Sequence, residues 1–419
     1  MLELISGLHT PNFDTREEKI DYLQTEVFRK DKHARDAVIP LMNGGMSVDI
    51  TGTRFVEAMA AENLIGVYGA SLPGWRDIQE FEKGLSISER KELTRQANKK
   101  AIESASSFFR ERCNNAIVGA NLLRILKDYE GTREDLIKSG QFDILFVGAG
   151  LPDDLPERMA QDDCKNMFYV PIVSSATVAK FIRRKKRELG KAGKKYRQPD
   201  AIYLELPNEA GGHLGAKNIE QAQDDSLWDP VKICDEIWKV FPNTPIIIAG
   251  GIGYKDQIIH AYDIANGASM GTRFLLTQES GMPNNIIEEK YLNKNIPVVV
   301  DEMSSTGYAS RRLDIPVTER TEASIREAIR NCVSCVCGNK NECKYLLQAN
   351  KIDPDYPNYC IRRELIKTRN GIATVCFTGR QIEKFRYNKL YRGKNGELYV
   401  PTVKETIEFL LSNNSVDSK

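Results

Sequence analysis

The stretch D-A-I-Y-L-E-L-P-N-E-A-G-G-H-L-G, from Asp200 to Gly215, predicts a buried strand that opens directly into a glycine-rich turn. Its apolar run, residues 201–206, is typical of a strand, and the Pro, Asn and Gly residues that follow end it. The turn carries His213, one of only four histidines in the chain. Gly211 and Gly212 allow the backbone to approach a ligand closely. A hydrogen-bonded loop histidine is the simpler interpretation of this stretch alone, so the rest of the chain has to decide.

Seven further apolar runs repeat this pattern, and most of them end in glycine or small polar residues. They are residues 37–42, 64–68, 115–121, 142–150, 168–173, 245–249 and 268–270. The eight runs alternate with helical segments, as parallel strands require, because each pair needs a crossover connection. The spacing predicts an α/β fold, a (β/α)8 TIM barrel, with every carboxyl end of a strand on one face.

The chain of 419 residues suits one large barrel with additional segments. We expect the barrel to span residues 37–317, after an N-terminal helical extension of residues 1–36. Residues 318–419 form a Cys-rich C-terminal extension that is predicted to pack on the barrel. Residues 73–107 are polar and rich in Lys and Glu, so they are either an inserted lid or a solvated helical decoration.

The overall charge does not favour a nucleic acid or a membrane as partner. Lys and Arg number 59 and Asp and Glu 58, which leaves a net charge of +1. The N-terminus lacks a secretion signal and no run approaches the ~20 apolar residues that span a bilayer. We therefore expect a soluble cytoplasmic protein that acts on a small molecule, as a monomer or a homodimer.

A basic helix is predicted at residues 177–197, with R-R-K-K-R at residues 183–187. Such a run is usually a solvated helix face. The alternative is a docking surface for an acidic partner such as an acyl-carrier protein.

Two glycine turns after the last two strands predict a phosphate site. The first is A-G-G-I-G, with Gly250 and Gly251, and the second is G-T-R-F, with Gly271 and Thr272. In TIM barrels these loops commonly hold a phosphate with backbone N–H groups. Together with the glycines after the first strand and the histidine after the sixth, they suit a flavin mononucleotide (FMN) across the barrel mouth.

Three motifs, N-E-A-G-G-H-L-G, I-I-I-A-G-G-I-G and G-A-S-M-G-T-R-F-L-L-T-Q-E-S, resemble the nitronate monooxygenase family, also called 2-nitropropane dioxygenases. This family includes flavin-dependent enoyl-acyl-carrier-protein reductases, and the resemblance covers roughly residues 35–320. It implies an FMN-binding TIM barrel with His213 as the catalytic histidine. The residues expected to bind the flavin are Asn43, Gly44, Gly45, Met46, Asn121, Glu205, Gly211, Gly212, Gly250, Gly251, Gly271 and Thr272.

Three functions remain open at this point. The first is FMN-dependent oxidation of nitronates or nitroalkanes, in which His213 handles the substrate proton. The second is NAD(P)H-dependent reduction of an enoyl-acyl-carrier-protein thioester. The third is a non-catalytic flavin- or metal-binding protein. Glu205 and Glu209 either orient the imidazole or contact the flavin, and the alternative for Glu205 is a charge inside the barrel that pairs with a Lys or Arg.

Five of the nine cysteines fall together near the C-terminus, in N-C-V-S-C-V-C-G-N-K-N-E-C and at Cys360. In a reducing compartment such a cluster indicates metal binding or reactivity before disulfides. Cys332, Cys335, Cys343 and Cys360 could hold zinc or an iron–sulfur cluster, with Cys337 left over or replacing one of them. The alternative is a set of buried thiols without a metal.

Overall fold

The computed structural model describes residues 7–29, 38–78, 81–82, 84–318, 321–333, 335, 343–345 and 358–412. Within these residues, eight parallel strands form one sheet in the order β1-β9-β8-β6-β5-β4-β3-β2. A parallel bridge between Met42 and Ile65 joins the two ends of the sheet, which closes the barrel. The predicted (β/α)8 fold is therefore confirmed.

Each barrel strand overlaps the apolar run that predicted it. The strands are β1 (Met42–Asn43), β2 (Gly66–Gly69), β3 (Val118–Leu123), β4 (Ile144–Gly148), β5 (Phe168–Val173), β6 (Ile202–Glu205), β8 (Ile246–Ala249) and β9 (Gly267–Met270). Their residues are almost all buried, because helices cover the outside and side chains fill the inside.

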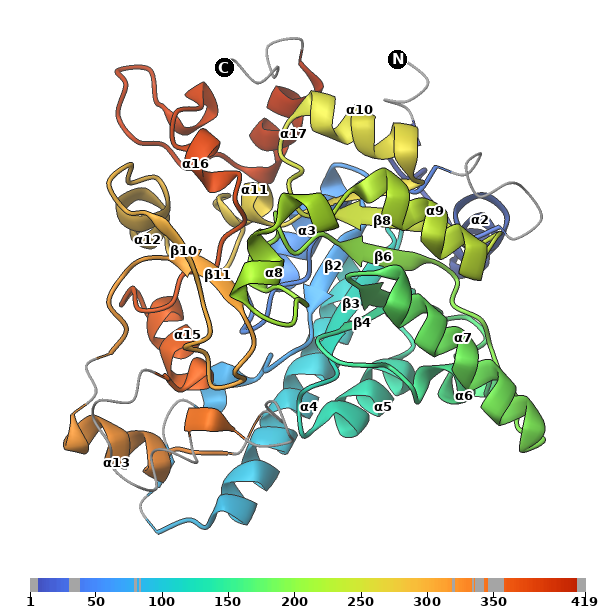
Figure 1. Ribbon diagram of the computed structural model, residues 1–419, viewed down its shortest axis with the longest axis horizontal. Coiled ribbons are helices and arrows are strands. Elements are labelled where there is room, and N and C mark those ends of the chain that lie inside the picture. The colour runs from blue at the N-terminus through green and yellow to red at the C-terminus, as the bar shows by residue number, and fades with distance from the viewer. Residues whose placement is uncertain are drawn as a thin grey trace.

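The helices that cover the barrel are α3 (Thr53–Ala61), α4 (Ile87–Arg112), α5 (Tyr129–Ser139), α6 (Leu155–Arg158), α7 (Ala176–Lys191), α8 (Ile219–Gln223), α9 (Pro230–Val240) and α10 (Lys255–Ile264). Figure 1 shows α5, α6 and α7 on one side of the strands, with α4 beside α5 and running away from the barrel toward the lower left of the view. The long helix α4 connects β2 to β3 and begins at a capping box formed by Ser86 and Glu89. The basic helix α7 ends at Lys191, earlier than its sequence predicts.

The end of the barrel opposite the carboxyl ends of the strands is filled by the N-terminal segment. The helix α2 (Arg16–Tyr22) continues into a π-helical turn, η1 (Leu23–Val27). Leu23, Val27 and Phe28 join the apolar cluster inside the barrel. Lys19 is buried there as well, and its ammonium lies 3.1 Å from the carboxylate of Asp143. The carboxylate of Asp143 compensates the ammonium of Lys19, and this offsets the cost of burying either charge alone.

A second, antiparallel sheet lies beside the barrel mouth and was not expected from the sequence. It consists of β7 (Gly212–His213), β11 (Ser310–Leu313) and β10 (Val298–Asp301), in the order β10-β11-β7. The polar stretch of residues 301–312, which reads as a loop, is therefore the turn and second strand of a hairpin. In Figure 1, β10 and β11 lie close to α12 (Asn284–Ile286) and α15 (Ile361–Arg369), on the side of the barrel away from α7.

The last part of the chain packs against the barrel through one apolar cluster. Its regular elements are α13 (Glu322–Arg330), α15, α16 (Ile382–Phe385), η8 (Lys389–Tyr391) and α17 (Val403–Leu411). Phe385 and Tyr391 join Tyr254 and Leu275 in this cluster, so residues from both parts of the chain share a core. Short elements complete the described chain, namely η3 (Trp75–Ile78), η4 (Asp162–Cys164), η5 (Asp225–Leu227), α11 (Thr272–Leu275) and η6 (Ile287–Tyr291).

None of the helices in the described part of the chain combines the length and the apolar character needed to cross a membrane.

Candidate active site at the barrel mouth

His213 is positioned by two sheets at once. The barrel strand β6 ends at Glu205, and the turn of residues 206–210 carries the chain into β7. There His213 pairs with Ser310 of β11 in antiparallel register. The imidazole Nε2 lies 2.8 Å from the hydroxyl oxygen of Ser304, and the ring packs on Phe377 with 5.5 Å between centroids. The predicted catalytic residue is thus held in one orientation at the carboxyl ends of the strands.

Burial lowers the pKa of His213 to about 4. Burial removes water from around the ring, and this penalises the charged imidazolium. No charged neighbour among the described residues contributes an opposing shift. The imidazole is therefore neutral at pH 7. A neutral imidazole can accept or donate a hydrogen bond to a substrate, but it is a weak base for removing a proton from carbon.

Arg311 holds the turn that leads to His213. Its guanidinium donates hydrogen bonds to the carbonyl oxygens of Pro207 at 3.2 Å and Asn208 at 3.0 Å, and a third to Ala210. The side chain is buried, and burial lowers the pKa of Arg311 to about 10. A planar group with several donors satisfies three carbonyls that would otherwise be buried without partners.

The first predicted phosphate turn, at Gly250 and Gly251, packs directly against residues 206–210, which precede β7. Gly250 and Gly251 have φ angles of +92° and +76°, which favour glycine. A Cβ on Gly250 would lie 3.0 Å from the carbonyl oxygen of Leu206, and one on Gly251 would lie 3.0 Å from Cγ of Glu209. Glycine is required here for backbone conformation and for close packing, independently of any ligand.

The second predicted phosphate turn borders open space. A Cβ on Gly271 would meet no atom within 4 Å, and one on Gly44 would lie 3.5 Å from Cα of Gly271. The N–H of Gly44 donates to the carbonyl oxygen of Met270, 3.0 Å away, so the ends of β1 and β9 stay together. Bare backbone at two neighbouring strand ends therefore faces a space that a ligand could occupy.

The side chain of Asn43 joins strands instead of facing a ligand. Its Nδ2 donates to the carbonyl oxygen of Val67 at 2.9 Å, and its Oδ1 accepts the N–H of Val67 at 2.8 Å. Asn43 is fully buried, and this pair of bonds links β1 to β2 where the barrel closes. Any flavin contact made by Asn43 would have to come from its backbone.

The next two predicted flavin-binding residues are held by other parts of the barrel. Gly45 lies so close to Asn121 of β3 that a Cβ on the glycine would overlap the Asn121 side chain. The backbone N–H of Met46 donates to the hydroxyl of Thr51, 2.9 Å away. These contacts bring residues 43–46 and Asn121 together and give Gly45, Met46 and Asn121 structural roles, while their contact with a flavin stays a prediction.

Glu205 and Glu209 differ in their surroundings. Desolvation raises the pKa of Glu205 to about 7, and no described residue forms an ion pair with it. Glu209 pairs with Arg380, whose Nη1 lies 3.4 Å from Oε1 of Glu209. Burial raises the pKa of Glu209, and the two arginines Arg380 and Arg311 oppose that shift. The ion pair with an arginine that the sequence suggested for Glu205 is found at Glu209 instead.

A C-terminal segment reaches the site and was missed as part of it. Residues 377–380, F-T-G-R, read only as packing in the sequence. The N–H of Gly379 donates to the hydroxyl of Thr272, 2.8 Å away. A Cβ on Gly211 would lie 2.6 Å from the nitrogen of Gly379. Ser304 and Arg311 were missed too, because nothing local in the sequence distinguishes them from other loop and strand residues.

The four cysteines predicted to bind a metal line one small cavity beside α13 and α15. Burial raises the pKa of the Cys335 thiol, and the nearby thiols of Cys360, Cys343 and Cys332 raise it further. Among the described residues, no group of three or more His, Cys, Asp or Glu side chains is arranged to hold a single metal ion. Cys337 lies outside the described residues.

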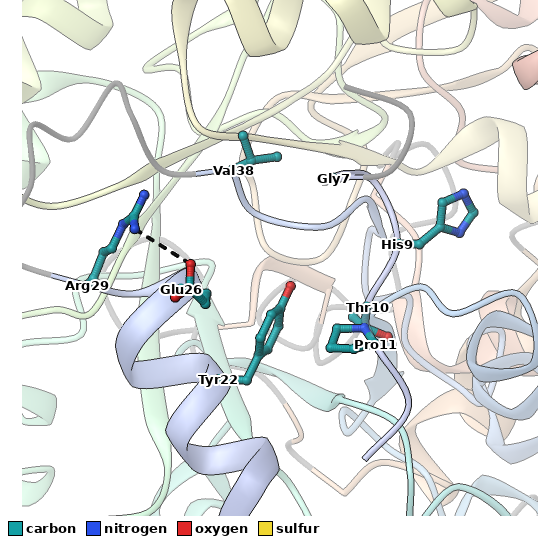
Figure 2. A pocket seen from close by; sticks show the side chains of 8 residues that line it. All are labelled: Gly7, His9, Thr10, Pro11, Tyr22, Glu26, Arg29 and Val38. Carbon is teal, nitrogen blue, oxygen red and sulfur yellow. Dashed lines mark ion pairs between the residues drawn. The ribbon is translucent and has the colours of Figure 1, made fainter. Parts of the chain in front are cut away.

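A separate groove lies at the opposite end of the barrel. Figure 2 shows Tyr22, Glu26 and Arg29 on one wall and His9 with Thr10 on the other, with Arg29 paired to Glu26 at 3.6 Å. It is adjacent to the residues that precede β1, and active sites of TIM barrels lie at the carboxyl ends of the strands. This groove is therefore not the candidate site.

Comparison with solved structures shows the same fold at low identity. FabK from Thermotoga maritima has 18% identity and a TM-score of 0.55, and the match covers 89% of this chain and 91% of that one. The enoyl reductase domain of MlnA, from the macrolactin biosynthesis cluster of Bacillus amyloliquefaciens, has 14% identity and a TM-score of 0.53, with 95% and 97% covered. A search of curated proteins by sequence gives no match.

The family comparison agrees with the motifs around His213. The model of the nitronate monooxygenase family matches residues 31–388, which include all eight barrel strands, the second sheet and the F-T-G-R segment. The chain belongs to the nitronate monooxygenase family and is an oxidoreductase of that type.

Proposed function

We propose that this chain is an FMN-dependent oxidoreductase that oxidises nitronates at the barrel mouth, with His213 binding the substrate next to the cofactor. The observation that carries the proposal is the neutral, oriented imidazole of His213 at the end of β6, held by Ser304. A nitronate has already lost its carbon-bound proton. It therefore suits a histidine whose lowered pKa makes it a weak base, better than a neutral nitroalkane does.

The residues at the mouth fit FMN. The open space beside Gly271, bordered by the bare backbone of Gly44, supports a planar ring lying against the strand ends. The N–H groups of the two glycine turns would hold the phosphate. Arg380 lies in the same region, but its charge is balanced by Glu209 at 3.4 Å and Asp225 at 3.0 Å, so the backbone N–H groups would carry the phosphate contacts. FMN bound there would supply the electron transfer, while the protein binds and orients the substrate.

Each side chain has a defined task in this proposal. The neutral imidazole of His213 donates or accepts one hydrogen bond to the nitro group, and Ser304 keeps the ring in place. Arg311 fixes the turn before it through three carbonyl groups. Glu205, with its pKa raised to about 7, is largely protonated below that pH and can then donate a hydrogen bond to the cofactor.

The second candidate is reduction of an enoyl thioester with NAD(P)H, as the name of the MlnA domain suggests for that protein. An acyl-carrier protein would need a docking surface, and the basic run of α7 is the candidate that the sequence suggests. Arg184 and Lys185 already lie 3.5 Å and 3.6 Å from Glu188, and Arg183 donates to the carbonyl oxygen of Val240. The helix α7 starts at the barrel mouth, and its basic run begins seven residues later, at Arg183. At 1.5 Å per residue, the first basic side chain is therefore roughly 10 Å from the mouth along the helix. These contacts favour a solvated face.

The test uses the purified full-length protein. Its absorption spectrum is recorded first, because a protein that neither carries nor binds FMN contradicts both candidates. The flavin is then mixed anaerobically with propyl-2-nitronate, with 2-nitropropane, or with NAD(P)H. Rapid bleaching by the nitronate, much slower bleaching by the nitroalkane, and loss of both in His213→Asn are expected. Bleaching by NAD(P)H alone, followed by reoxidation by crotonyl thioester, would support the reductase instead.

A further inference from the structure

Four cysteines from three separate stretches of the chain meet at one cavity. Cys332 and Cys335 follow α13, Cys343 comes eight residues later, and Cys360 immediately precedes α15. Ser305 and the guanidinium of Arg362 complete the wall. Thiols that served only as packing would fill the space between them, because protein interiors are closely packed. Here they surround a space instead.

Each stretch that carries a cysteine is anchored to the rest of the protein. The carbonyl oxygen of Cys332 accepts a hydrogen bond from Arg90 of α4 at 2.8 Å. That of Cys335 accepts the N–H of Lys127 at 3.1 Å. On the other side, the N–H of Lys344 donates to the carbonyl oxygen of Ser305, 2.9 Å away. Hydrogen bonds of the backbone therefore help to hold the cysteine-bearing stretches in place.

The spacing and surroundings are those of a thiolate-bound metal centre. Cys332 and Cys335 form C-x2-C, in which two thiolates can share one centre. Cys360 is the N-cap of the nine-residue helix α15, which fixes its position at the wall of the cavity. The guanidinium of Arg362 at the cavity offsets part of the negative charge that four thiolates would bring.

A cluster and a single ion place different demands on the positions of the four sulfur atoms. A zinc ion needs its sulfur ligands about 2.3 Å from one centre, so the four sulfurs must be close together. No group of three or more such ligands is arranged in that way within the described residues. In an iron–sulfur cluster each thiolate binds a different iron or shares one with a single partner, so the cysteines can lie further apart.

We propose that Cys332, Cys335, Cys343 and Cys360 bind an iron–sulfur cluster. This site is additional to the proposed flavin chemistry and does not depend on it. Ser305 of the cavity wall follows Ser304, the hydrogen-bond partner of His213. The backbone of Ser304 also forms a bridge with Tyr359, next to Cys360. The cluster therefore has a structural role: it holds the loop that carries Ser304 against the C-terminal extension.

The experiment measures iron, acid-labile sulfide, zinc and flavin in the full-length protein, purified without oxygen and after reconstitution with ferrous iron and sulfide. We expect iron and sulfide in equal amounts, and a broad absorption beneath the flavin bands that bleaches with dithionite. Cys335→Ser and Cys360→Ser are each expected to lose at least about fivefold of the iron. Cys113→Ala, which changes a buried cysteine at the C-terminal end of α4, is the matched control and should keep its iron.

The outcomes separate this proposal from the proposed function. Wild-type protein that carries one zinc and no sulfide, or that binds neither iron nor sulfide after reconstitution, overturns the cluster even if no variant folds. Full iron content in Cys335→Ser and Cys360→Ser overturns the assignment of the ligands. Iron and sulfide in a protein without FMN would leave the cluster standing and contradict the flavin proposal alone.

Discussion

The imidazole Nε2 of His213 lies 2.8 Å from the hydroxyl oxygen of Ser304, which is 91 residues further along the chain. Ser304 is fully buried, and its hydroxyl also lies 3.1 Å from that of Thr306. The histidine comes from the end of a barrel strand, whereas the serine comes from the hairpin between β10 and β11. The orientation of the ring is therefore set by a segment outside the eight-stranded barrel.

Replacing Ser304 with alanine should lower kcat/KM for nitronate oxidation while the protein stays folded. The change removes the hydrogen bond to His213, worth about 1 kcal/mol, together with the contact to Thr306, so kcat/KM should fall about fivefold to tenfold. Steady-state kinetics and thermal unfolding measure the two effects. Ser139→Ala, which removes a hydroxyl bonded within the end of α5, is the control and should change neither by much. An unchanged kcat/KM in Ser304→Ala would show that the serine does not position His213.

The contact between Gly211 and the F-T-G-R segment should be intolerant of any side chain. A Cβ at Gly211 would lie 2.6 Å from the nitrogen of Gly379, so backbone must move. We expect Gly211→Ala to cost about 1–3 kcal/mol of unfolding free energy, as overpacking does, and to lower activity. Urea denaturation measures the first effect.

Gly190→Ala provides the matched control for that substitution. Gly190 lies in α7, and a Cβ there would meet no atom within 4 Å. Alanine is a better helix former than glycine, so this variant should gain roughly 0.5–1 kcal/mol. Equal effects at the two glycines would mean that residues 377–380 do not pack on β7 as described.

The barrel could be predicted from the sequence because its strands are buried on both faces. Such strands read as short apolar runs, and Ile246–Ala249 is the clearest of them. The weakest was β1, which is reduced to Met42–Asn43. There the Asn43 side chain takes over strand pairing by bonding to Val67, and this depends on a partner distant in sequence.

The second sheet could not be predicted, because its central strand does not have a strand-like sequence. The strand β11 reads S-R-R-L, and two consecutive arginines normally indicate solvent. Both are buried: Arg311 bonds to the carbonyls of the turn before β7, and Arg312 lies 2.8 Å from Asp301. His213 and the glycine turns carry local signals, whereas Ser304 and Arg311 acquire their roles only through these tertiary contacts.

Arg273 should link the barrel to the C-terminal extension. It is fully buried, its guanidinium carbon lies 3.6 Å from the ring centroid of Phe385, and its Nη1 lies 2.9 Å from the hydroxyl of Tyr391. Arg273→Met keeps much of the volume but loses the cation–π contact and leaves polar partners unsatisfied. We expect a cost of about 2–4 kcal/mol and faster proteolysis near residues 380–400.

Arg330→Met is the control for this variant, since Arg330 is exposed at the end of α13. A surface substitution of this kind should change the unfolding free energy by no more than about 0.5 kcal/mol. Denaturant unfolding and limited proteolysis are carried out on both variants. If Arg273→Met were as stable and as resistant as Arg330→Met, the arginine would not join the two parts of the chain.

Glu205 should make the cofactor-free protein less stable as the pH rises. Desolvation raises its pKa in the folded state to about 7, against a value of 4.5 for an exposed glutamate. Between these two values the folded state binds more protons than the unfolded state, so the unfolding free energy falls with increasing pH. Below about pH 4 the carboxyl is neutral in both states, and above about pH 7 it is ionised in both. The penalty is therefore complete above pH 7, on the order of 3 kcal/mol.

Glu205→Gln removes this penalty, so its stability relative to wild type should rise from pH 4 to pH 7 and then level off. Urea denaturation at several pH values measures the difference. Glu405→Gln is a control with the opposite sign. Burial acts to raise the pKa of Glu405, but hydrogen bonds from Thr402 and Tyr399 outweigh it and lower the pKa. That carboxylate stabilises the fold above its unfolded pKa, so Glu405→Gln should lose stability at neutral pH and not in acid. A difference between Glu205→Gln and wild type that did not change with pH would show that the Glu205 carboxyl is well solvated at the mouth.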